Sequence, residues 1–156
     1  FHGRNAAARF FEALDIETYK ESASSPPPFP VGAHARIVFI SDFFTDIDAI
    51  SAAAARAAAL GSKGVLLQLV DPAEETFPFK GRTEFENPEG AGSLIVGDAG
   101  ALREIYQREF AAHRDLLISL CNRFQWTFIA HRTDAPASAA LLALYAALSD
   151  QRGRSW

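Results

Sequence analysis

One short stretch, residues 37–42, constrains the fold of this chain more than any other. An uninterrupted apolar run, Ile37–Ile40, ends there in Ser41 and Asp42. Such a run predicts a strand that is buried on both faces, as in a parallel sheet covered by helices. Because ligands of such sheets bind beyond the carboxyl ends of the strands, Asp42 is the first residue to consider for chemistry.

Further apolar runs alternate with helical patterns along the chain. After a first strand at residues 36–41, a capping box at Thr45 and Asp48 predicts a helix that ends near Gly61. A second buried strand is expected over residues 64–71. Strand, helix and strand at this length predict a right-handed parallel crossover, and therefore an α/β fold.

The second half of the chain continues this alternation after an interruption. Residues 83–86 and 93–96 predict a hairpin excursion. A long helix capped by Asp98, a third strand over residues 126–130 and a last helix opened by residues 134–136 follow. The long helix is expected to keep its wet face at Arg103, Glu104, Arg108 and Arg114. The last helix is expected to turn these residues inward: Leu141, Leu142, Leu144, Tyr145 and Leu148.

The two ends of the chain differ in character from the central part, residues 35–150. Residues 1–14 predict a helix of the same domain, and residues 15–34 are a Pro- and Ser-rich connector. Residues 151–156 form a short tail. The sequence has no methionine, and we therefore expect it to be a piece of a longer protein.

Composition excludes several classes of function. A net charge of −4 argues against a nucleic-acid partner and against an anionic membrane surface. No apolar run approaches the roughly 20 residues of a membrane-spanning helix. The single cysteine, Cys121, excludes an internal disulfide and a zinc site built from several cysteines, and it fits a reducing compartment such as the cytoplasm.

Polar residues follow all three expected strands, where a shared site would form. Asp42, Asp71 and the pair His131-Arg132 come at these ends. Carboxylates suit Mg²⁺, and we take Asp42 as the candidate metal ligand. Capping of the following helix is the alternative for Asp42, and turn chemistry is the alternative for Asp71, which precedes a proline. His131-Arg132 either binds an anion or is a solvated strand end.

Other titratable residues carry weaker signals. His113 lies on the apolar stripe of the long helix and is expected to be a core histidine with a hydrogen-bond partner. Cys121 is expected to be inert core. Five glutamates crowd the hairpin region, either as a solvated acidic surface or as paired catalytic acids: Glu74, Glu75, Glu84, Glu86 and Glu89.

Several segments together resemble a bacterial family, the domain of unknown function 58, whose members carry a von Willebrand factor A-like domain. The chain is similar to the short, soluble members of alphaproteobacteria. The segment Asp71–Glu75 followed by Phe77–Phe79 is the most specific part of the resemblance. The segments that carry it are residues 37–42, 66–75, 77–86, 106–113 and 131–136.

The resemblance implies a doubly wound, mainly parallel Rossmann-type sheet with a metal-ion-dependent adhesion site. That site uses an Asp-x-Ser-x-Ser loop after the first strand, a threonine from a second loop and an aspartate after the fourth strand. Asp42 matches the last of these, and the other two have no counterpart here. The chain therefore matches the C-terminal half of such a domain, and its Mg²⁺ site is incomplete. Ser41, Asp46 and Asp71 are the further candidate binding residues.

The resemblance also implies a function and two kinds of partner. Family members resemble partners of MoxR-type AAA+ ATPases, so a non-enzymatic protein-interaction module for complex assembly or maturation is expected. Without the strand that precedes it in the fold, the strand Arg36–Ser41 is expected to pair with a missing segment or to form a homodimer through its edge. The alternatives are a metal-assisted hydrolase using Asp42 and Asp71, and a metal-free scaffold domain.

Overall fold

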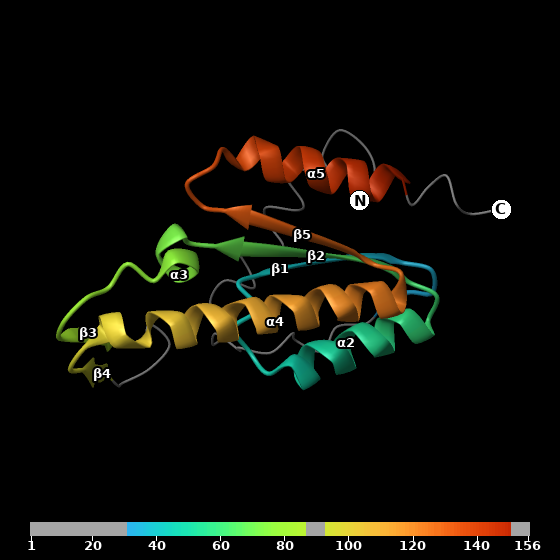
Figure 1. The fold of residues 1–156 in the computed structure, drawn as a ribbon. Helices are drawn as coiled ribbons and strands as arrows, with labels where there is room; N and C mark the ends of the chain where they lie inside the picture. The colour runs from blue at the N-terminus through green and yellow to red at the C-terminus, as the bar shows by residue number, and fades with distance from the viewer. Residues whose placement is uncertain (1–30, 87–92, 151–156) are drawn as a thin grey trace.

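The computed structural model describes residues 31–86 and 93–150, and its fold is shown in Figure 1. Strands and helices alternate, which confirms the predicted α/β fold. The predicted helix at residues 1–14, most of the connector at 15–34 and the tail at 151–156 lie outside the described residues. The elements are β1 (Arg36–Ser41), α2 (Ile47–Ala59), β2 (Lys63–Val70), α3 (Pro72–Thr76), β3 (Thr83–Glu86), β4 (Ser93–Val96), the 3₁₀ helix η1 (Ala99–Leu102), α4 (Arg103–Phe124), β5 (Thr127–Arg132) and α5 (Ala137–Asp150).

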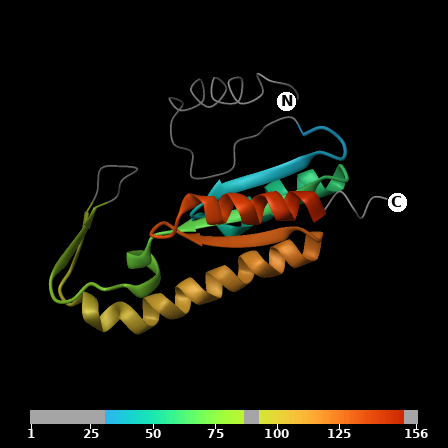
Figure 2. The same cartoon turned by 90° about the horizontal axis from the view of Figure 1, so that it is seen from above.

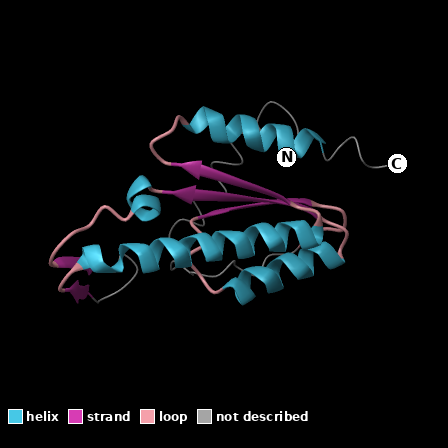
Figure 3. Cartoon of the chain, viewed as in Figure 1, coloured by secondary structure: helices cyan, strands magenta, loops and turns pink. Residues whose placement is uncertain are grey.

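Three strands form a parallel sheet in the order β1-β2-β5, compatible with a Rossmann-like fold (Figure 3). The central strand β2 is buried on both faces, with Val65 and Leu66 both 0% exposed. This burial explains its unbroken apolar sequence, because neither face of the strand meets water. Ser41 pairs with Gln68 and Val70 pairs with Arg132, so the carboxyl ends of the three strands lie along one edge of the sheet.

Helices α2 and α4 cover one face of the sheet, on the side opposite α5 (Figure 1). The alanines of α2 allow close packing, and Ala54 and Ala57 are buried. The ring of Trp126 lies directly over Gly64, where an added Cβ would come within 2.1 Å of it. The buried core on this face consists of Ile37, Phe43, Ile50, Ala54, Ala57, Leu66, Leu117, Leu120, Cys121 and Trp126.

Helix α5 covers the other face, against β2 and β5, and here the sequence prediction was partly wrong. Leu141, Leu142 and Tyr145 were expected to face inward, but they are 63%, 69% and 72% exposed. The helix instead buries Ala140. Because α5 is apolar around most of its circumference, its periodicity could not choose the buried face.

Two features of the long helix also differ from expectation. Asp98 caps η1, through a hydrogen bond from the Gly100 amide, and α4 begins only after that 3₁₀ turn. Arg103 and Arg114 do not lie on a wet face. The Arg103 side chain donates to the Phe77 carbonyl at 2.9 Å, and Arg114 joins a polar network described below.

The predicted hairpin is confirmed, with β3 and β4 antiparallel. It projects beyond the sheet near the start of α4 (Figure 2). Its turn, with Glu89, lies outside the described residues. In the ranges 31–86 and 93–150, no helix is long and apolar enough to cross a bilayer.

Candidate functional site at the carboxyl edge of the sheet

The turn after β1 gives Asp42 its position. Asp42 Oδ1 accepts hydrogen bonds from the Phe44 amide at 3.1 Å and from the Ser41 hydroxyl at 3.2 Å. The Ser41 hydroxyl accepts from the Phe43 amide at 3.1 Å. Phe43 takes up a left-handed conformation with φ 61°, which these two side chains stabilise. As a result Phe43 enters the core, while Asp42 and Phe44 remain exposed.

Asp46 and Asp71, two of the predicted binding residues, both act as helix caps. Asp46 Oδ1 accepts from the Asp48 amide at 3.1 Å, so Asp46 rather than Thr45 begins α2. Asp71 forms a capping box with Glu74, which begins α3. Its second oxygen accepts from the Thr133 hydroxyl at 3.2 Å and so ties the end of β2 to the loop after β5.

The register does not place Asp42 and Asp71 side by side. Asp42 lies one position beyond Ser41, whereas Asp71 lies three positions beyond Gln68, the pairing partner of Ser41. Among the described residues the two carboxylates share no hydrogen-bond partner. The two side chains are therefore staggered by two residues along neighbouring strands, and each is held by the hydrogen bonds of its own turn or cap.

A polar network that the sequence analysis missed links the strand ends to α3 and α4. The Gln68 amide donates to the Asp42 carbonyl at 3.1 Å and accepts from Arg114 Nε at 3.3 Å. Arg114 also binds the Glu75 carboxylate at 2.9 Å. Gln68 is only 1% exposed, and burial of an amide requires such partners. The signal was present in the sequence, as the one polar residue inside the apolar run of residues 65–70.

Arg132 extends this network to the loop after β5. Its guanidinium lies 3.6 Å from Glu75 and 2.8 Å from Asp134. The hydrogen bond between Arg132 and Asp134 lowers the pKa of the Asp134 carboxyl and raises the pKa of Arg132. Arg132 is therefore paired with two carboxylates, which weakens the case for anion binding by His131-Arg132.

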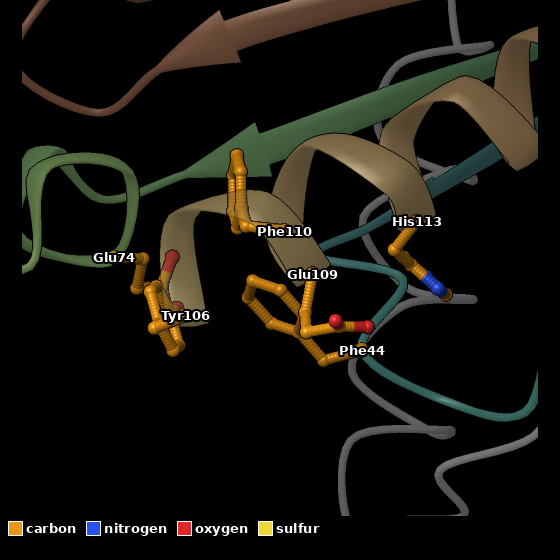
Figure 4. Close-up of a pocket in the computed structure, with 6 residues that line it drawn as sticks. All are labelled: Phe44, Glu74, Tyr106, Glu109, Phe110 and His113. Carbon is orange, nitrogen blue, oxygen red and sulfur yellow. The ribbon is translucent and has the colours of Figure 1, made fainter. Parts of the chain in front are cut away.

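A pocket of about 500 Å³ lies beside this edge, between the β1–α2 turn, α3 and α4 (Figure 4). Phe44 packs against Phe110 at a ring distance of 5.8 Å, and Tyr106 stacks along Phe110 at 6.2 Å. His113 Nε2 lies 2.7 Å from the Phe43 carbonyl and must be the donor, because a carbonyl only accepts. The pocket is lined by Phe44, Glu74, Tyr106, Glu109, Phe110 and His113.

Burial raises the pKa of two side chains on α4, Tyr106 and Cys121. Burial, and then the charge of Glu74, raise the pKa of the Tyr106 hydroxyl, so this phenol stays neutral. Burial raises the pKa of the Cys121 thiol to about 11. Cys121 is 2% exposed, in agreement with its expected role as core.

The described residues do not by themselves fit a Mg²⁺ site. Within residues 31–86 and 93–150, no three His, Cys, Asp or Glu side chains form a group that could hold a metal ion. Asp42 offers one exposed carboxylate, whereas Mg²⁺ takes six oxygen ligands in an octahedron, some of them water. Further ligands would have to be hydroxyl or carbonyl oxygens, water, or groups outside these residues.

The fold and this edge define an α/β protein with a parallel sheet, whose strand ends carry a paired charge network and an adjacent aromatic pocket. The chain belongs to the family described as "Protein of unknown function DUF58", whose model matches residues 30–116, more than half of the chain. A search of curated proteins and a search of solved structures gave no match. The resemblance stated from the sequence is thus confirmed at the level of the family.

Proposed function

We propose that the protein is a non-enzymatic interaction module that docks a partner protein at the carboxyl edge of the sheet, around Asp42 and Phe44. The observation that carries this proposal is the β1–α2 turn. It presents an exposed carboxylate next to a phenylalanine that is 45% exposed and that borders a pocket. Aromatic rings that keep one side in water are typical anchors of protein interfaces.

The surroundings of the turn support binding rather than catalysis. Glu75, Arg114, Arg132 and Asp134 neutralise one another in ion pairs. Both carboxylate oxygens of Asp71 accept hydrogen bonds that hold the fold. Hydrolysis would need a nucleophile, a base and an orienting group around one reacting atom, and the described part of the edge offers no such set.

The family resemblance extends the proposal to a metal and a partner. Oδ2 of Asp42 makes no hydrogen bond or ion pair within the described residues, so this atom is available to a Mg²⁺ ion completed by ligands from elsewhere. A bound Mg²⁺ would supply an electrophilic contact for a partner carboxylate. The proposed partner is a MoxR-type AAA+ ATPase, and the proposed process is assembly or maturation of a complex in the cytoplasm.

The test is a binding titration with the MoxR-type ATPase of the same organism, in which calorimetry measures the dissociation constant. Phe44→Ala and Asp42→Asn are each expected to weaken binding about tenfold or more, as for central interface residues. Leu142→Ala is the matched control, because Leu142 is 69% exposed on the opposite side of the sheet. Unchanged binding by both Phe44→Ala and Asp42→Asn would overturn the proposal.

A chelator separates the two roles of Asp42 in the same titration. If EDTA weakens wild-type binding as much as Asp42→Asn does, the carboxylate acts through a metal. If EDTA has no effect while Asp42→Asn weakens binding, the carboxylate contacts the partner directly, and the metal part of the proposal fails.

We also propose that β1 can join a second copy of the chain. Within the described residues β1 is one of the two outer strands of the sheet, and its Ile40 side chain is 57% exposed. An exposed apolar edge strand recruits another chain. Light scattering of the purified protein is expected to give a dimer that Ile40→Lys converts to a monomer. A wild-type monomer at high micromolar concentration contradicts this.

A further inference from the structure

The lining of the pocket beside Phe44 combines aromatic rings with carboxylates, which points to the kind of ligand it takes. Three of its six lining residues are aromatic, namely Phe44, Tyr106 and Phe110. Two others, Glu74 and Glu109, are carboxylates, and none is a lysine or arginine. Ring faces and carboxylates both attract a cation, so the two kinds of group favour the same occupant.

The two carboxylates are held in ways that leave them able to bind. Glu74 Oε2 accepts from the Asp71 amide at 2.8 Å, which fixes its side chain as part of the α3 capping box. Glu109 has one ion pair among the described residues, to Arg108 at 3.7 Å, with both side chains about 70% exposed. Such a long surface pair contributes little and is readily exchanged for another cation.

The protein already stacks one of its own guanidinium groups on a ring of this cluster. Arg114 lies over Phe110 with its central carbon 4.8 Å from the ring centroid, and it is then held by Glu75. This contact combines a ring face, a planar cation and a carboxylate in one place. The pocket offers the same combination to a cation from outside, with Phe44 as its exposed ring and Glu109 as its exposed carboxylate.

We propose that this pocket receives an arginine side chain of the partner protein, stacked on Phe44 and paired with Glu109 and Glu74. This inference rests on the proposed docking function and names the side chain that the docking surface would recognise. Arginine suits the pocket better than lysine, because its planar guanidinium stacks on rings and donates from a fork to carboxylates. An acidic side chain would be repelled, and an apolar one would remove water from the two carboxylates without offering them a hydrogen bond.

The test uses peptides as probes and nuclear magnetic resonance as readout. A five-residue peptide with a single central arginine, capped at both ends, is titrated into the isotopically labelled protein. It is expected to shift the amide signals of the β1–α2 turn and of the first half of α4, and to saturate with a dissociation constant in the millimolar range. The same peptide with citrulline, which keeps the shape and loses the charge, is expected to bind about tenfold more weakly or worse.

Variants of the protein locate the binding. Glu109→Gln is expected to weaken the arginine peptide about fivefold, and Phe44→Ala by a similar factor, while Phe44→Tyr retains binding. Glu104→Gln is the matched control, since Glu104 is an exposed glutamate of the same helix that does not line the pocket. Its dissociation constant is expected to stay within about twofold of wild type.

Three results would each overturn the inference: no saturable shift with the arginine peptide, equal binding of the citrulline peptide, or equal weakening by Glu104→Gln and Glu109→Gln. None of these results would contradict the proposed docking function, because the ATPase titration with Phe44→Ala and Asp42→Asn tests that function separately. If those two variants lose the ATPase while the peptide results fail, the docking surface stands and its arginine chemistry is wrong.

Discussion

The two faces of the sheet are covered very differently, although their strands have similar apolar sequences. On the α2–α4 face, Leu66 and Leu117 are 0% exposed. On the α5 face, Ile40 of β1 is 57% exposed and Leu142 of α5 is 69% exposed. Within residues 31–86 and 93–150, two adjacent helices therefore enclose a dense core on one side, while α5 lies mainly over β2 and β5 on the other. Apolar composition alone therefore does not decide which side chains are buried, because burial depends on what packs over each strand.

The largest expected effect is on the free energy of unfolding, when a leucine is shortened on each face of the sheet. Leu117→Ala leaves a cavity in a closed core and is expected to lower the free energy of unfolding by about 3–4 kcal/mol. Leu142→Ala removes the same atoms from an exposed site and is expected to change it by less than about 0.5 kcal/mol. Urea unfolding of both variants measures the difference, and similar losses would show that α5 is covered as tightly as α4.

The next effect concerns the contact between β2 and the start of β5 on the α2–α4 face. In Gly64→Ala the new Cβ would meet the Trp126 ring at 2.1 Å, and the rigid ring must shift. We expect a loss of about 2–3 kcal/mol in unfolding free energy. Gly97→Ala is the matched control, because nothing lies within 4 Å of its added Cβ. Equal stability of the two variants would mean that Trp126 has free space to move.

A smaller effect is expected at the carboxyl edge of the same face. Arg114→Ala leaves the Gln68 side-chain oxygen without its guanidinium donor and the Glu75 carboxylate with only the longer ion pair to Arg132, at a cost of about 1–2 kcal/mol. Arg108→Ala, on the same helix but with only a long exposed ion pair, should cost less than about 0.5 kcal/mol. Thermal unfolding of the pair checks this, and an equal change in melting temperature would argue against a structural network.

The smallest effect at neutral pH comes from Cys121 in this core. Because folding raises the pKa of its thiol from 9.0 to about 11, the folded state holds the proton more tightly than the unfolded state. Its contribution to stability is therefore complete below about pH 9 and is lost as the pH rises toward 11. The unfolding free energy of wild type should fall more steeply over this window than that of Cys121→Ala. Parallel slopes would contradict the raised pKa.

Much of the fold could be predicted from local sequence. The apolar runs at residues 37–40 and 65–70 correctly indicated parallel strands, and Gly61 marked the end of a helix. Burial on both faces is confirmed for the second run and was wrong for the first, where Ile37 is buried but Ile40 is 57% exposed. The buried faces of α4 and α5 were harder to predict. Arg103 and Arg114 were assigned to a wet face because they are charged, yet both reach back to groups on β2 or the segment after α3.

The candidate site was predicted only in part, for a related reason. Asp42 was identified because a strand end is a local feature of sequence. The pocket unites Phe44, Glu74 and residues of α4, which are far apart along the chain, and no local pattern brings them together. Gln68 alone carried a signal, since a polar residue inside an apolar strand requires a partner.

The sequence by itself determined the alternation of the longer strands and helices, their approximate bounds, and the family. These follow from periodicity, capping and turn chemistry, which act over a few residues. Only the tertiary structure decided which side chains are buried, which caps also bridge strands, and which charges remain unpaired. Those outcomes depend on the register of β1, β2 and β5 and on which helix covers which face, because contact between distant residues is fixed only when the chain is packed.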